Sequence, residues 1–158
     1  MESYSDSYSS SLNKIDNNLY LGGVIGASNS NLISRLHITS IVQILSHNIA
    51  VVIHKKIRYL KINIDDLPNV SIIRVVYEAV RFINRELTNG GAVLIHCAAG
   101  VSRSASVAVA YFMAKYNLSY AAALEKVKKG RGCVRPNEGF ERQLKEMDVR
   151  ALKNYMNA

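Results

Sequence analysis

The chain has 158 residues, of which 49% are hydrophobic and 20% are charged. This length fits one domain, and this apolar content excludes an intrinsically disordered chain. Lys and Arg number 20 against 12 Asp and Glu, so the net charge of +8 favours an acidic partner over a basic one. The basic residues are concentrated only at 126–135. This stretch has no aromatic residues on which the bases of a single strand could stack, so we expect no nucleic-acid partner.

The cysteine content and the apolar stretches indicate the compartment. Cys97 and Cys133 allow at most one disulfide and follow no secretory leader pattern. We therefore expect the reducing environment of the cytoplasm, or also that of the nucleus. Charges interrupt every apolar stretch well before 18 residues, and no lipidation motif is seen, so we expect no membrane partner. The sequence leaves the oligomeric state open.

The first part of the chain predicts a tail and then short strands. Residues 1–12 are rich in Ser and Tyr with little to bury, so we expect a flexible tail before a domain at residues 13–158. A helical piece is predicted from about residue 30. Strands are predicted on either side of it, at residues 19–23, 38–45 and 57–64.

The middle of the chain predicts an amphipathic helix followed by a buried strand. From residue 70 to Leu87, apolar residues recur at helical spacing, with charged residues on the opposite face. The helix should end at the Asn-Gly-Gly breaker, residues 89–91. The apolar residues 92–96 then predict a short buried strand.

Helices dominate the remainder of the predicted structure. Nearly every position after Gly100 is apolar, which predicts a central buried helix. Another helix is predicted from its cap Ser119 to Lys129, and a last one from its cap Asn137 to about Ala151. Strands that alternate with helices favour an α/β fold, here a single domain whose central, mostly parallel sheet has four to five strands flanked by helices.

The sequence HCAAGVSRS, residues 96–104, joins the last predicted strand to the central helix. A loop in this position points backbone N–H groups and the positive end of a helix dipole into one concavity, which binds an anion. Cys97 lies at its mouth, where this field favours the nucleophilic thiolate. The planar fork of donors on Arg103 matches two phosphate oxygens. The loop therefore predicts a nucleophile and an oxyanion clamp.

Other residues of this loop have expected supporting roles. Gly100 should supply a backbone angle or a close approach that a Cβ would forbid. Ser104 should hydrogen-bond the thiolate, although it is also suited to be a simple helix-start residue. The residues expected to bind a phosphate group are Ala98, Ala99, Gly100, Val101, Ser102 and Arg103.

HCAAGVSRS resembles the signature loop of the cysteine-dependent protein phosphatases, in which His-Cys precedes five residues and then Arg-Ser or Arg-Thr. NLYLGG, DDLP and VRPNEGFERQL are similar to stretches of the small atypical dual-specificity phosphatases, so the resemblance covers about residues 18–144. It implies a protein tyrosine phosphatase-like fold and no cofactor or metal. It also implies hydrolysis of phosphotyrosine and phosphoserine or phosphothreonine in phosphorylated proteins.

The resemblance also implies roles for individual residues. Cys97 would attack phosphorus to give a phosphocysteine intermediate, Arg103 would hold the phosphoryl oxygens, and Ser104 would ease breakdown of the intermediate. A general acid must protonate the leaving oxygen. The family takes it from the DDLP stretch, where Asp66 matches the position better than Asp65.

For several residues, a purely structural role stays open as an alternative. His96 either orients the loop or is a buried strand-end histidine, and Asn137 either supports the loop or only caps a helix. Cys133 is either an inert thiol or a redox partner of Cys97. The remaining histidines show no metal-binding spacing.

Two other functions compete with protein phosphatase activity. A rhodanese-like sulfurtransferase also places a loop cysteine beneath backbone amides, but it needs neither an acid at Asp66 nor a serine after its arginine. A non-catalytic phosphate-binding module would share the loop without turnover. Within phosphatases, the uncharged variable positions of the loop favour phosphoprotein over lipid or RNA substrates.

Overall fold

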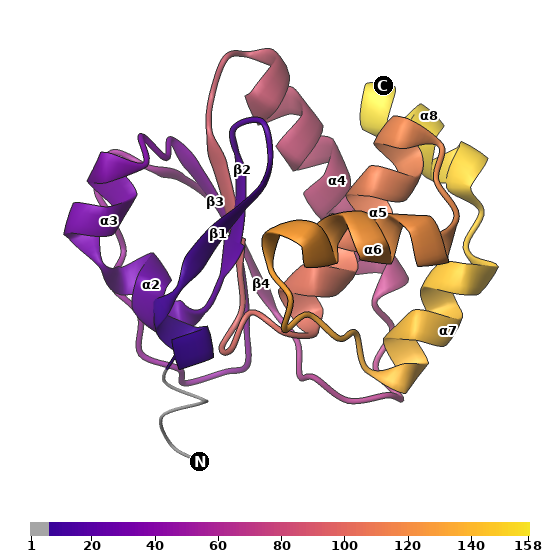
Figure 1. Ribbon diagram of the computed structural model, residues 1–158, viewed down its shortest axis with the longest axis horizontal. Coiled ribbons are helices and arrows are strands. Elements are labelled where there is room, and N and C mark those ends of the chain that lie inside the picture. The colour runs from indigo at the N-terminus through magenta and orange to yellow at the C-terminus, as the bar shows by residue number, and fades with distance from the viewer. Residues whose placement is uncertain (1–6) are drawn as a thin grey trace.

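The computed structural model describes residues 7–158, and its centre is one five-stranded sheet (Figure 1). The strand order is β1-β2-β5-β3-β4. β1 runs antiparallel to β2, and every other neighbouring pair is parallel. The predicted α/β fold with a mostly parallel sheet is confirmed. The strands are β1 Leu12–Asp16, β2 Leu19–Gly22, β3 Ser40–Leu45, β4 Arg58–Asn63 and β5 Val93–His96.

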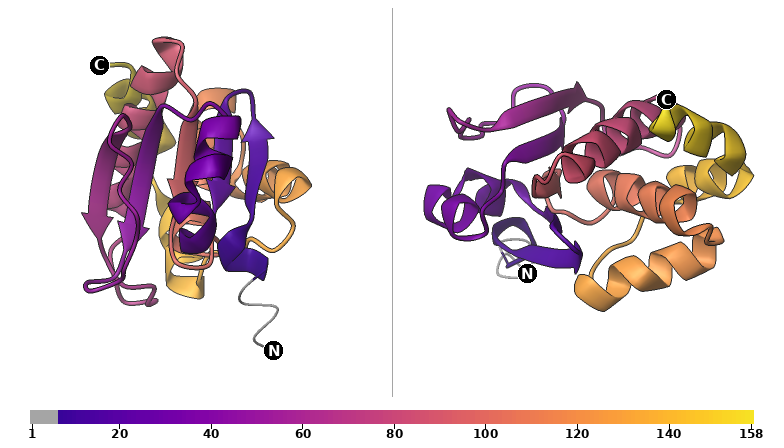
Figure 2. Two further views of the ribbon diagram at one scale, coloured as in Figure 1. Left: turned by 90° about the vertical axis from the view of Figure 1, so that its left-hand side faces the viewer. Right: turned by 90° about the horizontal axis from the view of Figure 1, so that it is seen from above.

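Helices cover both faces of this sheet (Figures 1 and 2). Because successive side chains of a strand point to opposite faces, β3 and β5 each contribute side chains to two separate hydrophobic cores. Ile41 and Leu94 belong to a small cluster with residues of α2 and α3, whereas Val42 and Ile95 belong to the main core with the other helices. The helices are α2 Val24–Ser28, α3 Ser30–Arg35, α4 Ile73–Thr88, α5 Arg103–Tyr116, α6 Tyr120–Gly130, α7 Glu138–Glu146 and α8 Val149–Asn157.

The predicted central helix is α5, which packs against the sheet and against α4, α6, α7 and α8. Its residues are buried from Arg103 to Ala114, which explains why its sequence is apolar on nearly every side. Even so, neither α5 nor any other helix of residues 7–158 is long and apolar enough to cross a membrane.

The start of the chain differs from the prediction. Residues 1–6 of the predicted tail lie outside the described residues. Residues 7–10 form a helical turn and Leu12 begins β1, so the fold starts earlier than the predicted boundary. The sequence pattern did not indicate β1, because Ile15 is the one buried residue of this edge strand.

The end of the chain also differs, because the single predicted last helix is two helices, α7 and α8. Met147 has an extended backbone conformation that ends α7. The carboxylate of Asp148 then accepts a hydrogen bond of 3.0 Å from the N–H of Ala151 and caps α8. The apolar rhythm concealed this break, since Leu144 and Leu152 on either side face the same core.

The carboxyl ends of β3, β4 and β5 lie at one end of the molecule, the lower end in Figure 1. β5 is followed by residues 97–102, which we call the cysteine loop, and then by α5. β4 is followed by residues 65–68, which we call the acid loop. In parallel α/β sheets, ligands bind at this edge.

Candidate active site

The cysteine loop turns its carbonyl groups outward. In a trans peptide, the N–H of the following residue points the opposite way, and the chain has no cis peptides in its described part. The N–H groups of residues 99–103 therefore point into the loop and form a cradle for an anion. Each carbonyl from residue 98 to residue 102 accepts a hydrogen bond of 2.7–2.9 Å. Arg131 donates to two of them, from Nη2 to Ala99 and from Nε to Gly100. Backbone N–H groups donate to the others: Val24 to Ala98, Arg135 to Val101 and Ser106 to Ser102.

The turn of the loop requires glycine at position 100. Gly100 has φ = +71°, a left-handed conformation that costs most residues free energy. A Cβ there would also lie 2.5 Å from the carbonyl carbon of Gly22 and 2.7 Å from Nη2 of Arg131. Both the backbone angle and the close approach that were expected at this position are present.

Cys97 lies at the start of the loop with its side chain 2% exposed. Its Sγ is 3.0 Å from Oγ of Ser104, which is buried in the first turn of α5. The hydroxyl of Ser104 is therefore placed to donate a hydrogen bond to a thiolate, in addition to standing at a helix start.

Arg103 presents one part of its guanidinium to the protein. Its Nη1 donates hydrogen bonds of 3.0 Å to Oγ of Ser46 and to the carbonyl of Ile64, which follow β3 and β4. Its Nε–H is buried and has no partner among the described residues. A buried donor without an acceptor costs free energy, and a phosphate oxygen is an acceptor that satisfies it. Ser46 was not predicted as part of the site.

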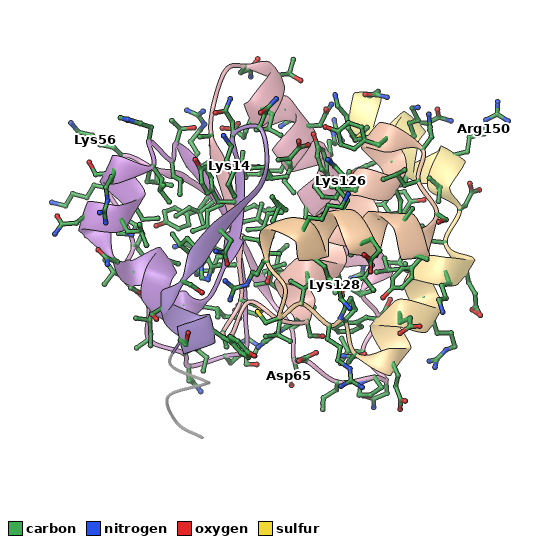
Figure 3. The ribbon with its side chains drawn as sticks, viewed as in Figure 1. Lys14, Lys56, Asp65, Lys126, Lys128 and Arg150 are labelled. Carbon is green, nitrogen blue, oxygen red and sulfur yellow. The ribbon has the colours of Figure 1, made fainter. Side chains whose placement is uncertain are left out.

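Asp66 of the acid loop lines a cavity of about 420 Å³ together with Val101 and Ser102 of the cysteine loop. Its Oδ1 accepts a hydrogen bond of 2.8 Å from Nδ2 of Asn137. Asp65 does not line this cavity, and its side chain lies at the lower edge of the molecule (Figure 3). Of the two aspartates, Asp66 is therefore the one that lines a cavity together with the cysteine loop.

Asn137 connects the parts of the site. Its N–H donates to Oγ of Ser102 (2.9 Å), and its side chain also accepts from the N–H of Phe140 (2.9 Å), which caps α7. Asn137 is thus a helix cap and a support at the same time, so the two interpretations of this residue are compatible.

A close backbone contact fixes the acid loop against α7. A Cβ on Gly139 would lie 1.9 Å from the carbonyl oxygen of Pro68 and 2.5 Å from its Cα. No rotamer change can relieve a clash between backbone atoms, so only glycine permits this approach. The contact sets the position of Asp66, two residues before Pro68.

His96 is buried at the end of β5. Burial lowers the pKa of His96 from 6.5 to about 4, against the opposing effect of its hydrogen bond with the carbonyl of Cys97. The ring is therefore neutral at pH 7 and carries one N–H. The N–H is on Nδ1 and donates to the carbonyl of Cys97 (3.2 Å), while the unprotonated Nε2 lies 3.3 Å from the side-chain amide of Gln43. These contacts hold His96 behind the cysteine loop and away from the cavity.

Arg131 is the main residue of the site that the sequence interpretation missed. It was counted with the basic stretch 126–135, but its side chain is buried at 2% exposure. Besides its two bonds to the cysteine loop, its guanidinium donates to Tyr8, Ser11 and Asn13 of the N-terminal segment. Glycines at 130 and 132 were the available signal, because small neighbours let a chain approach closely.

The charge of Arg131 has no carboxylate partner within residues 7–158. Burial lowers the pKa of Arg131 from its ordinary value, and attraction to Cys133, Cys97 and Tyr8 opposes this shift. The guanidinium places a positive charge beside the loop whose carbonyls it binds. Arg131 therefore both shapes the loop and contributes to its positive field.

Neither cysteine of the described chain is in a disulfide: Cys97 is buried and Cys133 is partly exposed. Within residues 7–158, no three His, Cys, Asp or Glu side chains gather as they would around a metal ion. The site thus combines the thiol of Cys97, the anion cradle of the cysteine loop and the carboxyl group of Asp66 beside the loop.

Comparison with known proteins gives consistent matches. The family described as "Dual specificity phosphatase, catalytic domain" matches residues 19–150. Dual specificity protein phosphatase 22-A of Danio rerio is 37% identical over 144 residues, which are 91% of this chain and 68% of that protein. The crystal structure of DUSP15 has a TM-score of 0.85 and 33% identity, covering 92% of this chain and 94% of the other. That of the human tyrosine phosphatase-like serine/threonine/tyrosine-interacting protein has a TM-score of 0.83 and 35% identity, covering 89% and 97%.

Proposed function

Because the chain belongs to the dual specificity phosphatase family and is a protein tyrosine/serine/threonine phosphatase, we propose that it acts through a phosphocysteine intermediate on Cys97. The observation that carries this mechanism is the cysteine loop itself. Its outward carbonyls leave five N–H groups directed to the inner side of the loop that begins with Cys97, and the buried Nε–H of Arg103, directly after this loop, has no partner among the described residues.

The first step transfers the phosphoryl group to the enzyme. The thiolate of Cys97 attacks phosphorus, the bond from phosphorus to the substrate oxygen breaks, and Asp66 gives its proton to that oxygen. The loop N–H groups and Arg103 hold the three remaining phosphoryl oxygens and stabilise their charge. The products are a dephosphorylated side chain and phosphocysteine.

The second step releases phosphate. A water molecule attacks the phosphocysteine, Asp66 takes up a proton from this water, and the bond from sulfur to phosphorus breaks. The hydroxyl of Ser104, 3.0 Å from Sγ, donates a hydrogen bond to the departing thiolate. The cycle restores the Cys97 thiolate and protonated Asp66, so atoms and protons balance without a metal or cofactor.

The surrounding residues keep these groups in place. Asn137 aligns Asp66 with the loop, while His96 and Arg131 hold the loop backbone. Phosphorylated proteins are the substrates that family membership supports. We propose the cytoplasm, or also the nucleus, as the location, because a catalytic thiolate needs a reducing compartment.

Phosphate release from a mixed panel of phosphotyrosine, phosphoserine and phosphothreonine peptides, under reducing conditions, tests the proposal. We expect release from all three classes. Sulfur transfer from thiosulfate, measured in parallel, should be undetectable, and its dominance would indicate the sulfurtransferase instead. Peptide binding without release at high protein concentration would indicate a phosphate-binding module.

Replacing Arg103 with Lys should lower kcat/KM on phosphopeptides by about 10²-fold, since a lysine ammonium cannot supply the planar fork of donors. We expect both weaker phosphate inhibition and a lower kcat. Steady-state kinetics with wild type and variant measure both. Near-normal values would show that the guanidinium does not clamp the phosphoryl group.

The Gly139→Ala substitution should lower kcat on phosphopeptides by about tenfold or more, because displacing a catalytic group by even about 1 Å can cost up to about 10² in rate. The added Cβ would push Pro68, and with it Asp66, away from the cysteine loop. Phosphate inhibition, which depends on the loop alone, should change little. Equal losses of turnover and phosphate binding would contradict this reason, and a melting curve checks that the variant is folded.

A further inference from the structure

Arg135 lies on the segment between α6 and α7 and lines the cavity that Asp66 shares with Val101 and Ser102. Its backbone N–H donates a hydrogen bond of 2.7 Å to the carbonyl of Val101. Pro136 is buried, and Asn137 is bonded to both Ser102 and Asp66. The backbone at Arg135 is therefore fixed between the cysteine loop and the acid loop, although its side chain is exposed.

The guanidinium of Arg135 has no ion pair or hydrogen bond recorded within residues 7–158, and it lines the cavity. Three carboxylates line the same cavity, and two of them have partners: Asp66 with Asn137, and Glu141 with Lys145 at 2.7 Å. Glu138 is exposed and has no such partner among residues 7–158. Within the described residues, Arg135 and Glu138 are therefore the cation and the anion of this cavity that have no ion-pair partner.

Arg135 lines the same cavity as Val101 and Ser102 of the cysteine loop, so residues next to a phosphorylated side chain bound in this loop would lie within reach of its guanidinium. We propose that Arg135 forms a subsite for a second anionic group of the substrate, either a carboxylate or a second phosphate within about two residues of the scissile phosphoryl group. The carboxylate of Glu138, which lines the same cavity, repels such a group and limits the preference for anionic substrates. This inference rests on the proposed function of the cysteine loop.

Three phosphotyrosine peptides of the same length test the subsite. They carry Asn, Asp or phosphoserine at the two positions that flank phosphotyrosine, and tyrosine formation is followed so that only one phosphate is scored. In wild type we expect kcat/KM relative to the Asn peptide to be about threefold higher for Asp. For phosphoserine, which carries nearly two charges, we expect about tenfold.

Arg135→Ala should bring both ratios close to one, and Glu138→Gln should raise them. Exposed charges are screened by salt, so the wild-type ratios should also fall when salt is raised from 20 mM to 500 mM, which shortens the Debye length roughly fivefold. The matched control is Arg150→Ala, since this exposed arginine of α8 lies at a distant edge of the molecule (Figure 3) and should leave the ratios as in wild type.

Unchanged ratios in Arg135→Ala, with the Asn peptide still hydrolysed, would overturn the subsite and leave the proposed function intact. A response to phosphoserine alone would restrict the subsite to a second phosphate, and a response to both would establish a general anion subsite. Absence of tyrosine formation from the Asn peptide by wild type would instead contradict the proposed function itself.

Discussion

Cys97→Ser should reduce phosphate release by about 10⁴-fold or more, the largest loss of any single substitution considered for this chain. Sγ of Cys97 stands beside the ring of N–H groups, where an attacking atom is needed. A serine hydroxyl fills nearly the same space but is not ionised near neutral pH, so it is a far weaker nucleophile. The substitution removes the chemistry while the cradle is kept.

The cradle should therefore still bind phosphate or vanadate in the Cys97→Ser variant. Isothermal titration with vanadate measures this binding, and thermal unfolding checks the fold. Cys133→Ser is the matched control, because Cys133 takes no part in the proposed steps and its loss should leave turnover near wild type. Substantial turnover by Cys97→Ser would exclude the assigned nucleophile.

Asp66→Ala should lower kcat/KM on phosphotyrosine and phosphoserine peptides by about 10² to 10⁴, the usual contribution of a positioned general acid. The leaving oxygen of a peptide side chain is a strong base and must be protonated as its bond breaks. A nitrophenolate ion leaves without much protonation, so kcat/KM for nitrophenyl phosphate, which reports only the first step, should fall much less. The ratio of the two losses reports proton donation.

Asp65→Ala provides the comparison for this prediction. Asp65 precedes Asp66 directly, but it does not line the cavity. We expect its removal to change turnover on both kinds of substrate by less than about threefold, in the range of exposed surface changes. If Asp65→Ala shows the selective loss and Asp66→Ala does not, the two assignments must be exchanged.

Local signals in the sequence were sufficient for most of the fold. The Asn-Gly-Gly breaker, the cap Ser119 and the buried runs around β3 and β5 act within a few residues, and each lies where it was predicted. β1 was not predicted, because an edge strand needs few apolar residues. The break between α7 and α8 was missed because the cap at Asp148 competes with an apolar rhythm that continues across it.

The residues proposed to carry out the chemistry could be predicted from the sequence, but the residues that hold them in place could not. The residues from Cys97 to Ser104 are contiguous, so their spacing could be interpreted without knowledge of the fold. Arg131 and Ser46 bond to this stretch across 31 and 57 positions of sequence. Their burial is decided by tertiary packing, and a charged residue between glycines resembles a surface turn. Only the structure shows that Arg131 connects the loop to the N-terminal segment.

The central claim is that a phosphoryl group passes through Cys97, and it can be tested on the Asp66→Ala variant. Without Asp66 to accept a proton from water, the second step slows, and phosphoenzyme should accumulate during turnover of nitrophenyl phosphate. Acid quenching, proteolysis and mass spectrometry should find one phosphoryl group on the peptide that contains Cys97. Continued nitrophenolate release with this peptide unmodified, or with the phosphoryl group on another residue, would contradict the mechanism.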